Sequence, residues 1–168
     1  MIWNAMLASV DAIAARRLPL LGAAAPERKP FVAAASGAMA MKPAPIEPSW
    51  IISGAPDARK AEVSRSDDEA AVTAVWDCTA GEFRWYFGWD ETVTILEGEV
   101  HVTAEDGTAR TLRAGDVGFF AGGTWATWRI DDYLKKVAVC RKPFPKPLAL
   151  AYKLRNSLRG GTPIGLAA

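Results

Sequence analysis

The stretch DETVTILEGEVHVTAEDGTARTLRAGDVGFFAGGTW, residues 90–125, decides the fold. Short runs of branched and aromatic residues alternate in it with turn-forming residues, a pattern typical of antiparallel strands. Asp106 and Gly107 stand between two alternating runs and predict a hairpin, because glycine accepts the positive φ that a tight turn demands. Strands this short and this regularly spaced predict a sandwich or a barrel rather than an alternating α/β fold.

The same pattern continues on both sides of this stretch. Eight runs have the composition of strands: 71–78, 83–87, 92–97, 99–104, 109–113, 117–121, 125–130 and 133–140. Residues 147–160 predict one closing helix, because Leu150, Leu154 and Leu158 recur at helical spacing.

Length and composition narrow the class of protein. A chain of 168 residues fits one domain and can bury a sizeable core. Half of its residues are hydrophobic and its net charge is only +1, which argues against a disordered chain and a nucleic-acid-binding protein. No apolar run is long enough for a membrane span. Cys78 and Cys140 are too few for a disulfide scaffold, so we expect free thiols and a cytoplasmic location.

The two ends differ in composition from the middle. We expect residues 1–49, which are rich in alanine and proline, to form a poorly ordered extension with a short helix over 2–16. The natural start could also be Met39 or Met41. Residues 50–146 form the expected barrel, and 147–168 a basic helix and tail without acidic residues. This tail is either a solvated helix or a contact for an acidic partner or anionic lipid surface.

Two spacings carry a family resemblance. Glu91 is followed by six residues and then Gly98, and Gly115 by five residues and then Ala121-Gly122-Gly123. These spacings resemble parts of the two motifs of the cupin superfamily. Within it, WDCTAGEFRWYF, DETVTILEGEV and LRAGDVGFFAGG are similar to the ureidoglycine-aminohydrolase-like branch. The resemblance covers roughly residues 70–140 and implies an all-β cupin jelly-roll barrel.

The same resemblance argues against a metal site. Metal-binding members use two histidines and the glutamate of the first motif, and one histidine of the second. The paired-histidine positions hold other residues under either spacer length: Trp85 and Phe87, or Arg84 and Tyr86. Ala126 stands at the position of the second motif's histidine. Only Glu91 remains of the four ligands, so we expect no metal and no cofactor.

His101, the one histidine of the sequence, does not replace these ligands. It alternates with Val100 and Val102, so valines that face inward would turn His101 to the opposite face of its strand. We therefore expect a solvent-facing or inter-sheet histidine. The alternative is a ligand or a general base.

Glu91 has several possible roles if it points into the barrel. A buried, unpaired carboxylate is unfavourable by several kcal/mol, so it must be compensated. It could pair with a cation, for which Arg84 on the neighbouring strand is the nearest candidate. It could instead take up a proton and act as an acid, or bind the amine or hydroxyl of a ligand. The remaining interpretation places it beside Asp90 at a hydrated barrel rim.

These observations predict a small cupin that binds or transforms a small polar metabolite, nitrogen-containing compounds among them, inside its barrel. The candidate catalytic residues are Glu91, Tyr86 and Arg84. The candidate ligand-binding residues are aromatic: Trp85, Trp125, Trp128 and Phe119. As an enzyme, the chain would carry out hydrolase-like or lyase-like chemistry. The alternative is a non-catalytic metabolite-binding or dimerising module, and we expect a homodimer that buries the surplus aromatic side chains.

Overall fold

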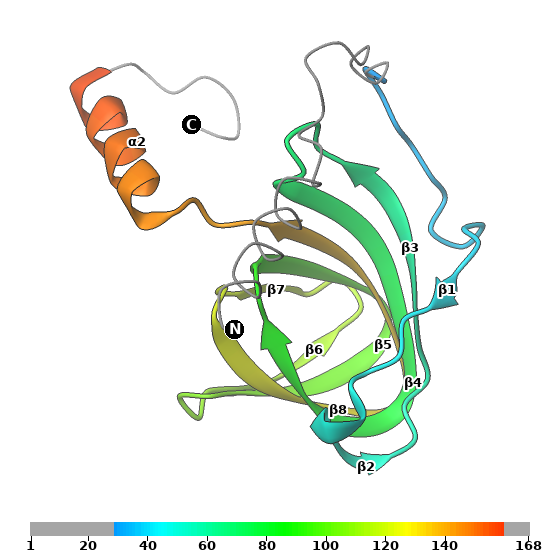
Figure 1. The fold of residues 1–168 in the computed structure, drawn as a ribbon. Helices are drawn as coiled ribbons and strands as arrows, with labels where there is room; N and C mark the ends of the chain where they lie inside the picture. Colours follow the sequence, from blue (N-terminus) through cyan, green and yellow to red (C-terminus); the bar gives the residue numbers. More distant parts are fainter. Residues whose placement is uncertain (1–28, 160–168) are drawn as a thin grey trace, which may run out of the picture. The chain divides into compact units, whose positions relative to one another are not determined.

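A computed structural model describes residues 29–159, and the helix expected over 2–16 lies outside these residues (Figure 1). The described residues from Val32 onward belong to one compact unit. Its elements are β1 (Lys42–Pro43), a 3-10 turn η1 (Pro48–Trp50), β2 (Ile51–Gly54), β3 (Ala58–Arg65), β4 (Ala71–Phe87), β5 (Asp90–Ala104), β6 (Ala109–Arg113), β7 (Val117–Phe120), β8 (Thr124–Arg141) and α2 (Lys146–Arg159).

The strands form one antiparallel sheet in the order β1-β3-β4-β8-β5-β6, with β2 also paired to β4 and β7 to β5. Figure 1 shows the long strands β4, β5 and β8 bending around a common interior. Strand β8 lies between β4 and β5 and is paired with both of them along most of its length. The prediction of an all-β jelly-roll barrel is confirmed.

The concave face of this sheet carries the hydrophobic core. Its largest fully buried side chains come from the three long strands: Trp128, Phe83, Phe87, Ile95, Ile130 and Leu134. Phe87 stacks on Phe120 with ring centroids 4.3 Å apart, so aromatic contacts contribute to this core. Val100 and Val102 are both buried, as their alternation with His101 predicted.

The prediction of eight short strands was wrong in one respect. Six of the eight runs join pairwise into β4, β5 and β8, because the residues between them continue the strand instead of turning the chain. At one such corner Asp131 and Asp132 of β8 oppose the single residue Ala80 of β4. A bulge of this kind bends a strand sharply while its hydrogen-bonded pairing continues on both sides. The residues that predicted a turn at this corner therefore mark a bend within one continuous strand.

Strands β1, β2 and β3 were not predicted. Strand β3 was not recognised from the sequence because its inward-facing side chains include Lys60 and Glu62, which interrupt the alternation of apolar and polar residues. Ile46, on the N-terminal side of the expected barrel boundary at residue 50, is buried in the same core. Segments that precede the recognisable β pattern thus contribute to the barrel.

The hairpin at Asp106-Gly107 is confirmed: it joins β5 to β6, and Gly107 has φ +86°. Helix α2 is confirmed, and its Leu150, Leu154 and Leu158 are exposed. No helix among the described residues is long and apolar enough to cross a membrane.

Cys78 and Cys140 are free, as expected. Their strands do lie side by side, but Cys78 pairs with Leu134 whereas Cys140 pairs with Val72. Six residues along β8 separate the two positions, roughly 20 Å at the rise of an extended strand. A disulfide between them would require their Cα atoms to lie within about 7 Å.

We predict that Gly98, the motif glycine after Glu91, cannot be replaced by another residue without a large loss of stability. It has φ +74°, and an added Cβ would overlap the carbonyl oxygen of Tyr133 on β8. We expect Gly98→Ala to lower the free energy of unfolding by more than about 4 kcal/mol. Gly107→Ala is the matched control, because Gly107 has a similar φ but no atom near its missing Cβ, and should lose only about 1–2 kcal/mol. Equal losses in urea unfolding would contradict the role given to the contact between β5 and β8.

Candidate functional site

A pocket of about 200 Å³ opens on the concave face between β3, β4, β5 and β8. Its floor is made of small side chains, since Ala74 of β4 and Ala138 of β8 lie directly opposite each other and both line it. Trp76 and Trp85 form apolar walls, and Cys140 lies further along β8.

One buried ion pair supplies the polar groups of this pocket. Lys136 Nζ donates a hydrogen bond to Glu91 Oε1 over 2.7 Å, and the two side chains are only 4% and 12% exposed. On β8, Lys136 and Cys140 flank Ala138 on the same face, and Glu91 of β5 is opposite Cys140. The ammonium therefore reaches the carboxylate diagonally, across the small Ala138 side chain.

Two indole rings surround the ammonium of Lys136. Its Nζ lies 4.3 Å from the ring centroid of Trp128 and 5.0 Å from that of Trp76. The π faces of tryptophan attract a desolvated cation, so the rings compensate part of the lost hydration. The indole nitrogens of Trp76 and Trp128 are buried, and neither has a hydrogen-bond partner in the part of the chain that the structure describes.

The structure changes the partner expected for Glu91. Glu91 points into the barrel and pairs with a cation, but that cation is Lys136 and not Arg84. Arg84 and Tyr86 lie on the outer face of β4, where both pack against Trp125. The reason is parity, because Phe83, Trp85 and Phe87 of the same strand face the interior.

The predicted aromatic residues divide between the two faces. Trp85 lines the pocket, and Trp128 lies in the core against Lys136. Trp125 packs with Arg84 outside, and Phe119 on β7 is 65% exposed. Two of the four predicted ligand-binding residues therefore lie next to the ion pair.

Sequence reasoning missed Lys136 as a candidate site residue. A signal was present, because Leu134, Lys136 and Ala138 alternate along β8 and all three are buried. A lysine in register with apolar residues on one face of a strand indicates an inward-facing cation. Only the pairing of β8 with β5 shows that Glu91 is its partner.

The residues at this site do not fit the metal of the cupin motifs. The inward-facing motif positions are Trp85, Phe87 and Ala126, none of which carries a metal-ligating atom. Glu91 is bound to an ammonium, which is not a ligand while protonated. Cys140 opposite Glu91 adds at most a second donor, and burial raises its pKa to about 11. Two donors are too few for a divalent transition metal.

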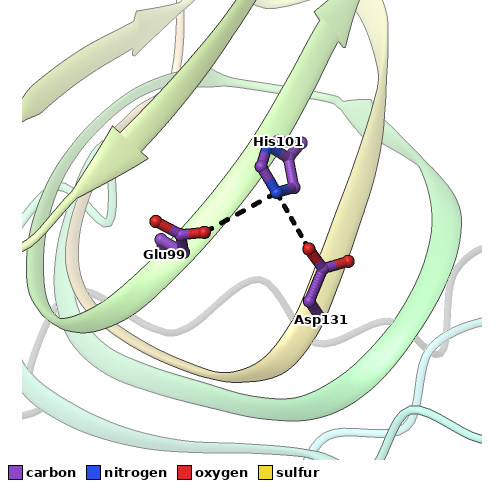
Figure 2. A group of neighbouring side chains, drawn as sticks. All are labelled: Glu99, His101 and Asp131. Atoms are coloured by element: carbon purple, nitrogen blue, oxygen red, sulfur yellow. Dashed lines mark hydrogen bonds and ion pairs between the residues drawn. The ribbon is translucent and has the colours of Figure 1, made fainter.

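His101 belongs to a separate cluster on the outer face (Figure 2). Its Nε2 lies 3.0 Å from Asp131 Oδ2 and 3.7 Å from Glu99 Oε1, and its Nδ1 lies 2.7 Å from Thr111 Oγ1. The opposite oxygens of the two carboxylates are bound by arginines: Arg113 with Glu99 at 2.9 Å, and Arg129 with Asp131 at 3.4 Å. The cluster is thus an internally paired network that joins β5, β6 and β8 at the corner of the barrel.

A EutQ-like cupin domain matches residues 65–138. This segment, less than half of the chain, is a cupin domain. This match includes Glu91 and Lys136 but stops before Cys140 and α2. No curated protein matches the sequence.

Three solved structures are similar to parts of this chain. A DUF861-family protein of unknown function from Pseudomonas syringae is 27% identical, with 61% of this chain and 45% of that protein covered and a TM-score of 0.57. A predicted oxalate decarboxylase from Thermotoga maritima is 18% identical, with 67% and 99% covered and a TM-score of 0.52. A DUF861-family protein from Thermotoga maritima is 36% identical, with 38% and 73% covered and a TM-score of 0.37. This chain therefore spans less than half the length of the Pseudomonas protein.

The buried ion pair leads to a stability prediction. Lys136→Met leaves the carboxylate of Glu91 buried without a partner, so the free energy of unfolding should fall by about 3–5 kcal/mol. The double variant Glu91→Gln/Lys136→Met leaves no lone charge and should recover most of that loss in urea unfolding. Arg84→Met on the outer face is the control and should change stability by less than about 1 kcal/mol. If the single variant is as stable as the unmodified protein, the pair is hydrated in solution.

The pKa of Cys140 predicts how its alkylation depends on pH. Burial, followed by the nearby charge of Glu91, raises its pKa to about 11. The thiolate fraction at pH 8 is then about one in a thousand, against roughly a quarter for an ordinary thiol of pKa about 8.5. Iodoacetamide labelling of the native protein, followed by peptide mass spectrometry, should therefore rise about tenfold per pH unit between pH 8 and 10. A rate that levels off near pH 9, as expected in urea, would show an unperturbed thiol.

Proposed function

We propose that this chain is a metabolite-binding cupin that holds a small polar ligand in the barrel pocket beside Glu91 and Lys136. The observation that carries the proposal is a buried ion pair lining a pocket whose floor is built from alanines. A buried ion pair seldom stabilises a protein more than well-packed apolar residues of the same volume would. Its presence beside an open space therefore favours ligand binding over a purely structural role.

The same groups suggest what the ligand carries. The second carboxylate oxygen of Glu91 receives no hydrogen bond from the described residues, so it can accept one from an amine or hydroxyl. The resemblance to the ureidoglycine-aminohydrolase-like branch also supports a nitrogen-containing metabolite. If the ligand is transformed, Glu91 and Lys136 are the groups placed to move protons, in hydrolase-like or lyase-like chemistry without a metal.

A thermal-shift screen with small amines, ureides and keto acids tests this proposal. A ligand that binds only the native state raises the melting temperature of the protein. Ala74→Leu fills the pocket and should abolish the shift, whereas Thr73→Leu on the opposite face of β4 should retain it. Binding that is equal in both variants would place the ligand outside the barrel pocket.

A second candidate is a dimerising module, favoured by an apolar patch on the outer face. Strand pairing places Phe119, Thr92 and Val139 in one row, and Val117, Thr94 and Val137 in the next. Phe119 and Val117 are 65% and 64% exposed. Such a patch fits a homodimer interface. Failure of every ligand in the screen, together with a dimer that Phe119→Ser dissociates, would favour this function over the first.

A further inference from the structure

The barrel pocket presents far more hydrogen-bond donors than acceptors. Lys136 has three N–H donors, and among the described residues only Glu91 Oε1 accepts from it. Trp76 lines the pocket, and its indole N–H is buried without an acceptor among the described residues. The same holds for the indole N–H of Trp128 beside Lys136. Buried donors in native proteins are normally paired, so these groups indicate an acceptor that residues 29–159 do not supply.

The side chains that line the pocket carry a net positive charge, which agrees with its excess of hydrogen-bond donors. Three cationic and two acidic side chains line it, which leaves one positive charge in excess: Lys60, Arg65 and Lys136 against Glu62 and Glu91. Arg65 is hydrogen-bonded to Glu62, and Lys136 to Glu91. Lys60 has no carboxylate within ion-pairing distance among the residues described. The unbalanced cation therefore lies on β3, at the side of the pocket facing Trp76.

From these observations we infer that the ligand of this pocket is a small monocarboxylate, bound by the ammonium of Lys136 and the indole N–H of Trp76. The inference rests on the proposed function and names its ligand class: the carboxylate meets Lys136, and a hydroxyl or amine elsewhere on the same molecule would meet the free oxygen of Glu91. A carboxylate supplies the acceptor oxygens that the buried donors lack and neutralises the excess charge. The walls of Trp76 and Trp85 and the alanine floor then suit a short apolar body. In this arrangement Lys136 provides a fixed cation at a site where the cupin motifs would place a metal.

Three probes of one size separate charge from shape: butyrate, butyramide and butylamine. Titration of the full chain, followed through the tryptophan indole N–H resonances in proton–nitrogen NMR spectra, gives an affinity for each. We expect butyrate to bind at least tenfold more tightly than the other two. The indole proton of Trp76, assigned with Trp76→Phe, should shift downfield as it gains a charged acceptor.

Two variants test the role of the ammonium. Glu91→Gln/Lys136→Met removes the ion pair without leaving a buried charge, so it should bind butyrate no better than butyramide. Lys135→Met, one residue away on the opposite face of β8, should retain the full preference for butyrate. The circular dichroism spectra of both variants check that each is folded.

The outcomes distinguish the two levels of the proposal. If butyramide or butylamine binds the unmodified protein as well as butyrate does, and Ala74→Leu abolishes that binding, the carboxylate inference is overturned while the pocket remains a binding site. If the double variant keeps the preference for butyrate, Lys136 is not the anchor and the inference fails. If no probe and no screened metabolite binds, the proposed function fails together with the inference.

Discussion

The pairing of β8 with β4 on one edge and β5 on the other is the constraint on which the barrel and its site depend. This double register places Lys136 opposite Trp76 and brings it within reach of Glu91. It also sets Ala138 opposite Ala74, which leaves the space of the pocket. A slip of β8 by one residue would turn Lys136 and Ala138 to the outer face, because side chains alternate along a strand. Register therefore creates both the core and the site.

Within that frame the Glu91–Lys136 pair determines what the interior can do. A barrel filled with apolar side chains would be at least as stable, since desolvating two charges offsets most of their attraction. The pair persists beside a pocket with a floor of small side chains, and the rings of Trp76 and Trp128 enclose the ammonium. Charge, space and unpaired indole donors thus coincide at one place. That coincidence favours recognition of a small anionic ligand over a structural role alone.

The outer face of the same strands has a different character. Arg84, Tyr86 and Trp125 pack together there, and His101 joins two carboxylates that arginines already bind. These groups satisfy one another and leave little unmatched charge or hydrogen-bonding capacity. Residues that looked catalytic by sequence proximity to Glu91 are therefore separated from it by the thickness of the sheet.

The sequence alone determined the barrel, the Asp106-Gly107 hairpin, the inward valines beside His101 and the loss of the metal-ligand set, because these follow from local alternation, turn chemistry and side-chain type. It did not determine the partner of Glu91, because Lys136 lies 45 residues away and only strand pairing brings them together. It also could not distinguish turns from bulged corners, since glycine and acidic residues mark both. The local sequence specified which segments form strands, whereas the face and register of each strand were decided only when the strands paired into the closed sheet.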